Sequence, residues 1–442
     1  MNNNAFFETF DELFEGLNPT NNVEAEQGVT AQPIATVNED SVTVHETNTT
    51  TSLVASAQTK IAMIRNEMNN LFVERDNAID CLLYALVSGQ STLLLGPPGT
   101  GKSAISYELC SRIENGNYFQ WMLNKTSDPS ELLGPFSIKG MENDKFTRIT
   151  TGKLPEAHVA FIDEVYKSNA PTLNILLPVM NEKIFYNDGR PISIPLMLFI
   201  GASNEGPEDE TLQAFHDRFL FRLNVNYIKD ASNKKRMYNN YLNERRGLSN
   251  LTAKTTITIE EVKALTEASK TIPVSKDIIN KFIRFINDLD KQGIHVSDRR
   301  QNECLKILQA SAIINGRQQV VIDDFKSLIY VLWEKENDIT FIENAITKMI
   351  NPYDDQIRNL KESFDSIKNT IDKCTDENSK ASMSLEAKTG IEKIVSKLNR
   401  IINDASRNGK DIKDFVDFRN EMTKYSNDIV SEALSASLGI SF

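Results

Sequence analysis

The strongest chemical signal in this sequence is a glycine-rich segment that ends in lysine and serine. It reads Gly96-Pro97-Pro98-Gly99-Thr100-Gly101-Lys102-Ser103 and fits the pattern G-x-x-x-x-G-K-[ST]. Glycines let successive backbone N–H groups turn toward one anion, and a helix that starts beside them adds its positive dipole end. A chance match in a chain of this length has a probability of about one or two in a hundred. We therefore predict a polyphosphate-binding loop.

Two side chains of this loop have defined chemistry. Lys102 is expected to reach the β and γ phosphates of a nucleotide, and the Ser103 hydroxyl is expected to ligate Mg²⁺. The remaining cofactor-binding residues that we predict in the loop are Gly96, Gly99, Thr100 and Gly101. The loop alone does not distinguish ATP from GTP.

An acidic pair follows the apolar run His158–Ile162. Asp163 is expected to hold Mg²⁺ through water, and Glu164 to orient and activate the attacking water, as a positioned carboxylate can. An isolated acidic pair at the end of a strand more often caps the next helix. The upstream phosphate loop favours the catalytic interpretation here.

An asparagine follows a third apolar run, Leu196–Ala202, which leads into Ser203-Asn204-Glu205. Ligands of open α/β sheets bind outside the carboxyl ends of the strands, so the Asn204 amide is expected beside the acidic pair. The alternative is a turn residue that bonds its own backbone, which is common for asparagine.

The elements that must position these residues form an α/β pattern. The strands expected at 91–95, 158–162 and 196–201 are continuous apolar runs, which is typical of parallel strands buried on both faces. We predict a doubly wound parallel sheet over residues 53–228, an all-α lid over 229–340 and a C-terminal helical hairpin or bundle over 341–442. The bundle is indicated by Ile357, Leu360, Phe364, Ile367 and Ile371, which alternate steps of three and four.

Residues 1–52 are expected to be a tail outside these domains. From about Asn18 to Thr51 the sequence has no helical period and predicts a flexible tether. Ahead of it, an acidic amphipathic helix is indicated by apolar residues at helical spacing. These residues are Phe6, Phe10, Leu13, Phe14 and Leu17. Docking to a partner and folding back onto the chain's own domain are equally compatible with this pattern.

Composition limits the function. The chain has 442 residues and a formal net charge of -12, which argues against holding nucleic acid through bulk electrostatics. No apolar stretch approaches the ~20 residues needed to cross a bilayer, and no secretory signal is evident, so a cytoplasmic protein is expected. The four cysteines are scattered and indicate buried thiols in a reducing compartment. The histidines show no zinc-hydrolase spacing.

With these residues in view, the chain resembles the MoxR family of AAA+ ATPases, and within it the RavA-like branch, over roughly residues 53–335. The order and spacing of several motifs carry the resemblance. Besides the phosphate loop they are Glu131-Leu132-Leu133-Gly134-Pro135, Gly152-Lys153-Leu154-Pro155-Glu156-Ala157-His158, Phe161-Ile162-Asp163-Glu164, Ala202-Ser203-Asn204-Glu205, Asp217-Arg218-Phe219-Leu220 and Ser297-Asp298-Arg299-Arg300.

The resemblance implies roles that the residue pattern alone does not give. Asn204 looks like sensor 1, Arg218 like an arginine finger offered to a neighbouring subunit, and Arg299 like sensor 2, with Arg300 as the alternative. Without the resemblance, these arginines would be interpreted as surface ion pairs. A finger supplied by a neighbour implies a homo-oligomeric ring, usually a hexamer, that uses ATP and Mg²⁺.

The resemblance also implies partners. Residues 134–152 look like the hairpin insert that the family projects toward the pore of the ring or toward a partner. Family members commonly act with a protein that contains a von Willebrand factor A domain. Residues 351–442 depart from the RavA-like pattern, because they show only helical periods where a β-rich module would be expected.

These expectations favour a chaperone-like enzyme that hydrolyses ATP to remodel, mature or load a partner protein. One alternative is an NTPase that acts on nucleic acid, which the acidic charge balance disfavours. Another is a nucleotide-gated scaffold whose slow hydrolysis acts as a timer. A small-molecule kinase is least favoured, because a helical lid and Arg218 suit an oligomeric cycle better.

Overall fold

The computed structural model describes residues 39–207, 210–246, 254–372, 377–407 and 412–438. The chain divides into two compact units, residues 1–48 and 49–442. In the first unit only residues 39–48 are described, as the start of a helix. The amphipathic helix expected around Phe6–Leu17 lies outside the described residues.

Helix α1 spans Glu39–Leu71, so it begins inside the segment 18–51 for which a flexible tether was expected. Its second half is amphipathic, since Ala57, Ile61, Ile64 and Met68 are fully buried at helical spacing. Once this half is packed, each further helical residue adds a hydrogen bond without a new nucleation cost. That physical reason accounts for a helix over a polar stretch with no apolar period.

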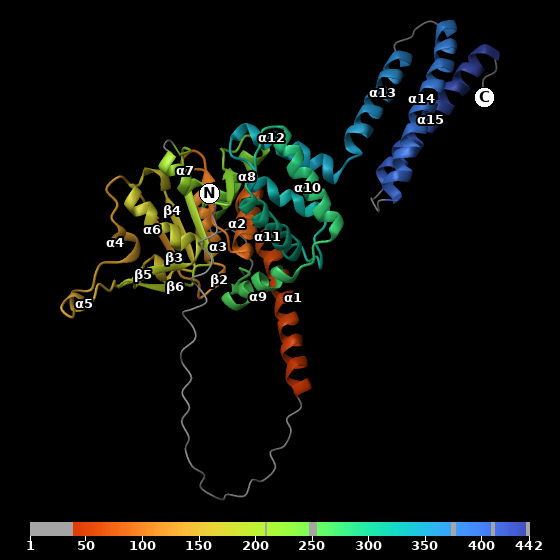
Figure 1. Ribbon diagram of the computed structural model, residues 1–442. Coiled ribbons are helices and arrows are strands. Elements are labelled where there is room, and N and C mark those ends of the chain that lie inside the picture. The colour runs from red at the N-terminus through yellow and green to blue at the C-terminus, as the bar shows by residue number, and fades with distance from the viewer. Residues whose placement is uncertain (1–38, 208–209, 247–253, 373–376, 408–411, 439–442) are drawn as a thin grey trace, which may run out of the picture. The chain divides into compact units, whose positions relative to one another are not determined.

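The central sheet has five parallel strands in the order β3-β4-β7-β1-β8. Figure 1 labels two of them, β3 and β4. The strands are β3 (Tyr118–Met122), β4 (Val159–Asp163), β7 (Leu198–Ser203), β1 (Thr92–Leu95) and β8 (Phe221–Asn224). Because all five run in one direction, their carboxyl ends share one edge of the sheet. The expected α/β fold with a parallel sheet is confirmed.

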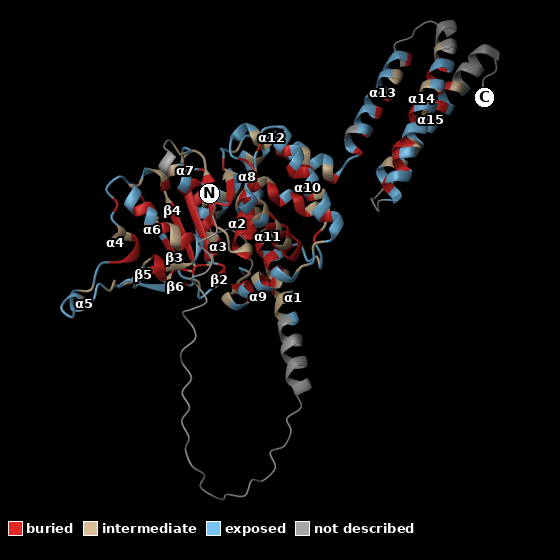
Figure 2. Ribbon diagram, in the orientation of Figure 1, coloured by how far each residue is buried: buried red, intermediate tan, exposed pale blue. Residues whose placement is uncertain are grey.

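Both faces of the sheet are buried (Figure 2). Successive residues of one strand enter different hydrophobic clusters: Leu93 packs on one face and Leu94 on the other, and Phe161 and Ile162 divide in the same way. This alternation explains why the strands are continuous apolar runs rather than alternating ones. Helices cover the faces and connect the strands. They are α2 (Asp76–Ser88), α3 (Lys102–Cys110), α6 (Ala170–Asn181) and α7 (Glu210–His216), with the short turns η1 (Leu154–Glu156) and η2 (Val165–Lys167).

Two additions interrupt the core. The insert between β3 and β4 carries α4 (Pro129–Leu133) and α5 (Ile138–Met141). An antiparallel hairpin of β5 (Ile184–Asn187) and β6 (Arg190–Ser193) follows α6. The sequence carries a signal for this hairpin in Asp188-Gly189, and both residues have the positive φ of a tight hairpin turn.

Among the described residues of the lid, every regular element is helical except one two-residue strand. Its elements are α8 (Ala231–Arg245), β9 (Ile257–Thr258, parallel to β2 at Ile113–Glu114), α9 (Ile259–Thr271), α10 (Lys276–Lys291), α11 (Asp298–Ile314), η3 (Ile322–Tyr330) and α12 (Glu336–Ile350). A capping box of Thr258 and Glu261 starts α9. The lid helices and one face of the sheet share a hydrophobic cluster, so lid and core are packed together.

The C-terminal helices form a separate hydrophobic cluster. They are α13 (Asp354–Asp372), α14 (Glu377–Arg407) and α15 (Lys413–Leu438). The lid cluster ends at Ile350 and this cluster begins at Tyr353, so the division falls at Asn351-Pro352, whereas the domain boundary expected from the sequence was at 340/341. Within the described residues after 353, every regular element is a helix.

The cysteines within the described residues pack in the core: Cys81, Cys110 and Cys304 are buried and free. Cys374 lies outside the described residues. No helix in the described part of the chain combines the length and the apolar character that a membrane span requires.

Candidate functional site

The phosphate loop connects β1 to α3 and is held against the end of β8. A Cβ atom on Gly96 would lie 2.3 Å from the carbonyl oxygen of Val225, so only glycine allows this approach. Gly96 N donates to Ser203 O at 3.0 Å, which fixes the loop between two strands. Helix α3 begins at Lys102, and its first N–H groups therefore face the loop.

Lys102 lies beneath the loop. Its side chain is buried, and Nζ donates to the carbonyl oxygens of Gly96 at 2.5 Å and Pro97 at 3.1 Å. Burial lowers the pKa of Lys102, and the nearby carboxylates of Asp163 and Glu164 oppose that shift. The amine is therefore a desolvated cation, which binds an anion more strongly than an exposed amine does.

Asp163 and Glu164 follow β4 at the same edge of the sheet. The backbone of Glu164 has φ 53° and ψ 44°, a left-handed conformation that is uncommon for glutamate and that re-aims the chain after the strand. Asp163 Oδ1 accepts from Glu164 N at 3.0 Å. Burial is the largest cause that raises the pKa of Asp163, and a cation bound beside it would favour its charged form.

Asn204 joins these groups. Its Nδ2 donates to Glu164 Oε1 at 2.8 Å, and its Oδ1 accepts from Lys102 Nζ at 3.4 Å. Glu164 Oε1 also forms an ion pair with Lys167 at 3.1 Å. Within the described residues, Glu164 Oε2 is buried without a hydrogen-bond partner, so this oxygen is free to accept from a reactant. The structure thus brings together the loop, Asp163, Glu164 and Asn204.

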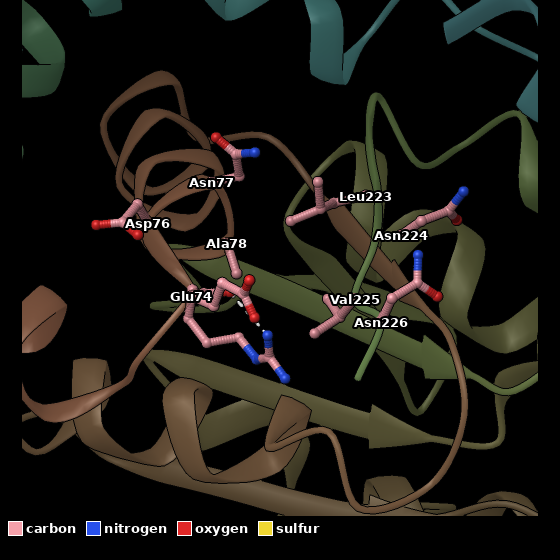
Figure 3. A pocket seen from close by; sticks show the side chains of 9 residues that line it. Glu74, Asp76, Asn77, Ala78, Leu223, Asn224, Val225 and Asn226 are labelled. Carbon is pink, nitrogen blue, oxygen red and sulfur yellow. Dashed lines mark hydrogen bonds between the residues drawn. The ribbon is translucent and has the colours of Figure 1, made fainter. Parts of the chain in front are cut away.

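A pocket of about 220 Å³ lies between the start of α2 and the end of β8 (Figure 3). Two segments far apart in the sequence line it: Glu74–Ala78 at the start of α2, and Leu223–Asn226 at the end of β8. Arg75 Nε donates to Thr100 O at 3.0 Å, and the Tyr227 hydroxyl donates to Pro98 O at 3.1 Å. One lining residue, Arg75, and the residue after the second segment, Tyr227, thus contact the phosphate loop. Neither segment carries a motif that the sequence analysis could have detected.

Arg218 and Arg299 do not lie at the phosphate loop of their own chain. Both line a pocket of about 160 Å³ together with Ser91 and Leu220, the residues that immediately precede β1 and β8. This pocket is therefore at the amino ends of the parallel strands, the edge opposite the phosphate loop. Arg299 is exposed, and Arg218 Nε is buried without a hydrogen-bond partner among the described residues. Neither arginine faces the phosphate loop of its own chain.

Arg300, the alternative to Arg299, has a structural role. Its side chain is buried, and it bonds Asp217 Oδ1 at 2.9 Å and Val331 O at 2.7 Å. A second buried arginine, Arg222, lies 3.8 Å from the same carboxylate and donates to Trp333 O. Burial and the charge of Arg300 lower the pKa of Arg222 to about 10. Asp217 thus balances two buried cations that join core and lid, and Arg300 is already paired within its own chain.

His216 precedes this cluster and stays neutral. Burial, with the positive charges of Arg222 and Arg300, lowers the pKa of His216 to about 3. Its Nδ1 is hydrogen bonded to the hydroxyl of Tyr166, whose own pKa is raised by burial. Tyrosine is therefore the donor and the imidazole the acceptor. Neither residue stands in a motif that predicts this contact.

This burial predicts a pH dependence of stability. In the unfolded chain His216 takes up a proton near pH 6.5, whereas in the folded chain it does so only near pH 3. Its contribution is therefore fully present above pH 6.5 and is lost as the pH falls toward 3. When the pH falls from 6.5 to 5, the unfolding free energy of the native chain is expected to decrease by about 2 kcal/mol more than that of His216→Asn. Chemical denaturation at both pH values measures this, and parallel losses would refute it.

The insert is anchored at its base by residues of the sequence motifs. Trp121 Nε1 donates to Glu131 Oε2 at 2.9 Å, and Lys153 Nζ donates to Glu131 O at 3.0 Å. Beyond this base, the insert contacts the β5–β6 turn through bonds from Phe146 N and Arg148 N, each 2.8 Å long. Large apolar side chains on insert and hairpin are exposed. They are Phe136, Ile138, Met141, Phe146, Ile149, Tyr186 and Ile192, which we call the insert surface.

Two models of known protein families match this chain. Residues 59–267 match the model of a MoxR domain found in MoxR-vWA-beta-propeller ternary systems, and residues 276–346 match an AAA lid domain. The two matches cover the sheet, the insert and most of the lid.

Individual proteins are also similar to this chain. An uncharacterized protein of Methanocaldococcus jannaschii is 36% identical over 71% of this chain and 80% of its own length. The chaperone MoxR1 of Mycobacterium tuberculosis is 22% identical over 60% of this chain and 71% of its own. A crystal structure of a candidate ATPase from Cytophaga hutchinsonii superposes with a TM-score of 0.55 at 18% identity, over 69% of this chain and 98% of that one, which supports the fold.

Proposed function

The chain belongs to the MoxR family of AAA+ ATPases, and we propose that it hydrolyses ATP in a ring of identical copies to remodel a partner protein. The division of the site residues between the two edges of one sheet carries this proposal. The two edges are separated by the length of β1, roughly 10 Å for its backbone alone. Since one chain cannot bring both sets to one phosphate group, a second copy must supply the arginines.

Each cleft would bind a nucleotide through its own chain. The phosphates would lie on the loop above Lys102, and the base would lie in the adjoining pocket between Glu74–Ala78 and Leu223–Asn226. Contacts of Arg75 and Tyr227 with loop carbonyls would link the two parts of the site.

The residues near the loop fit Mg²⁺, because a carboxylate and a hydroxyl are hard oxygen donors. Asp163 and Ser103 would hold it. When bound, the ion neutralises charge that develops on the phosphates. Glu164 would orient water through Oε2, while Asn204 and Lys167 hold Oε1 and so fix the direction of the carboxylate.

Arg218 and Arg299 of the neighbouring copy would complete the cleft. Because both line one pocket, a copy that docks this edge against its neighbour's loop presents both arginines to the γ-phosphate together. We therefore propose that sensor 2, like the finger, acts across the interface. A hexameric ring is the assembly we propose, as in similar ATPases.

Lys102→Ala is expected to weaken the binding of ATP by roughly tenfold to a hundredfold, the loss that follows from removing charge-assisted hydrogen bonds. Titration with a fluorescent ATP analogue in the presence of Mg²⁺ measures the affinity. Lys139→Ala, on the exposed insert, serves as the matched control. Equal affinities of the Lys102 variant and the native chain would contradict the nucleotide site.

The insert surface is the partner site we propose. Its seven exposed apolar side chains lie on two adjoining additions to the core, and exposed apolar patches of this kind mark protein interfaces. The matched family model belongs to systems that include a von Willebrand factor A protein, which supports a partner of that type. Membership of the RavA-like branch remains a prediction.

Replacing Ile138 and Phe146 together by serine is expected to weaken partner binding at least fivefold, because large side chains dominate such interfaces. Affinity for a purified von Willebrand factor A domain protein from the same genome is the measurement, with basal ATP hydrolysis expected to be unchanged. Leu385→Ser, an equally exposed change on α14, is the control. Unaltered affinity would exclude the insert surface as the docking site.

A further inference from the structure

One hydrogen bond joins the two halves of the divided site inside a single chain. The hydroxyl of Tyr166 donates to Nδ1 of His216. Tyr166 lies two residues after Glu164, on the turn η2, and His216 lies two residues before Arg218, at the end of α7. The bond therefore connects the backbone behind the water-activating carboxylate with the backbone that carries the finger.

This bond is built to be a fixed contact and not a proton carrier. His216 is 5% exposed, and the rings of Tyr166 and His216 lie against each other with centroids 5.9 Å apart. With Tyr166 protonated and His216 neutral, donor and acceptor roles are defined throughout the physiological pH range. A buried hydrogen bond of this kind transmits displacement, because breaking it would leave two buried polar atoms unpaired.

A second contact ties the finger segment to the strand that leads to Asn204. A Cβ on Gly201 would lie 2.6 Å from the ring of Phe219, so the ring is packed directly on the backbone of β7. Phe219 O accepts from Arg222 Nε, which holds the residue after the finger in place. The backbone around Arg218 is thus supported from the sides of both Glu164 and Asn204.

The same segment also reaches the lid. Asp217, between His216 and Arg218, bonds Arg300 at 2.9 Å, and Arg300 directly follows Arg299 on α11. A shift that begins at η2 would therefore move Arg218 and Arg299 as one group. Two arginines that move together suit a single γ-phosphate.

We propose that Tyr166 and His216 are positioning residues, which couple the placement of Glu164 in a chain's own cleft to the placement of Arg218 in the neighbour's cleft. The inference rests on the proposed function, since it requires the finger to act on another copy. A change at the strained turn of Glu164 reaches Arg218 through four residues and one hydrogen bond. In this way, a conformational change in one site alters the position of the arginine in the next site of the ring.

The test uses mixtures of two variants of the full chain. One is Arg218→Ala, which keeps its own cleft but offers no finger, and the other is Glu164→Gln, which offers a finger but cannot turn over. In the mixture, ATP is hydrolysed only where the first accepts the finger of the second. Tyr166→Phe is then added either to the finger donor or to the acceptor, and kcat and KM for ATP are measured.

The coupling predicts a loss of about threefold to tenfold in kcat, with KM unchanged, when Tyr166→Phe is in the donor, and little change when it is in the acceptor. Equal losses in both arms would indicate a merely structural role and overturn the inference, as would no loss in either. If the mixture without Tyr166→Phe gains no activity, the proposed function itself fails and this inference with it.

Variants of His216, which accepts the hydrogen bond from Tyr166, provide an independent check. In the finger donor, His216→Asn retains an amide oxygen that can accept from Tyr166 and is expected to keep most of the rate. His216→Leu removes the acceptor and is expected to behave like Tyr166→Phe. Tyr353→Phe, which deletes a buried hydroxyl bonded to Asp404 in the C-terminal helices, controls for loss of a hydroxyl as such. If Asn and Leu at 216 give the same rate, the hydrogen bond is not the coupling element.

Discussion

Arg218→Ala is expected to lower kcat for ATP hydrolysis by about 10³- to 10⁵-fold, the range attributed to arginine fingers in phosphoryl transfer. The guanidinium would stabilise charge on the γ-phosphate in the transition state, and alanine removes that charge. The affinity of the variant for ATP is expected to change little, because the phosphate loop belongs to the same chain as the base pocket.

The measurement is phosphate release at saturating ATP, with nucleotide affinity determined in parallel. Arg284→Ala, on the exposed face of α10, is the matched control and is expected to be as active as the native chain. A rate for Arg218→Ala within twofold of the native rate would show that the finger is assigned to the wrong residue.

Glu164→Gln is expected to reduce kcat by about 10²- to 10⁴-fold while ATP binding is retained. Glutamine has the same shape, and its carbonyl oxygen can still accept from Asn204, so the cleft stays intact. An amide cannot take a proton from water, however, and Oε2, which has no hydrogen-bond partner in the described part of the chain, is the oxygen that we propose to accept from water. The effect should therefore fall on turnover and not on affinity.

Single-turnover hydrolysis and nucleotide binding separate these two quantities. Glu205→Gln, an exposed glutamate next to Asn204, is the control. Weak ATP binding by Glu164→Gln with a native rate per bound nucleotide would contradict the assignment.

The residues of the cleft could be predicted from the sequence because local rules determine them. A parallel sheet brings the ends of its strands to one edge, so Asp163 and Asn204 had to lie near a loop that follows β1. The motif fixed Lys102 and Ser103 on the first turn of α3. No long-range information was needed for these positions.

Other parts depend on tertiary contacts that no local pattern encodes. The pocket that we propose for the base is lined by segments about 150 residues apart, and the Tyr166–His216 bond joins η2 to α7. The choice between Arg299 and Arg300 is similar: adjacent helical residues point about 100° apart, and only the packing of lid on core decides which is buried. Helical propagation into a polar segment likewise placed the start of α1 at Glu39.

The most direct test of the divided site is the rate of ATP hydrolysis by an equal mixture of Arg218→Ala and Glu164→Gln, compared with each variant alone. If subunits exchange randomly, about a quarter of the interfaces pair an intact Glu164 with an intact Arg218 from the next copy, so the mixture is expected to recover a substantial part of the native rate. A mixture no more active than its components, under conditions where the subunits demonstrably co-assemble, would contradict a cleft completed by the neighbouring chain.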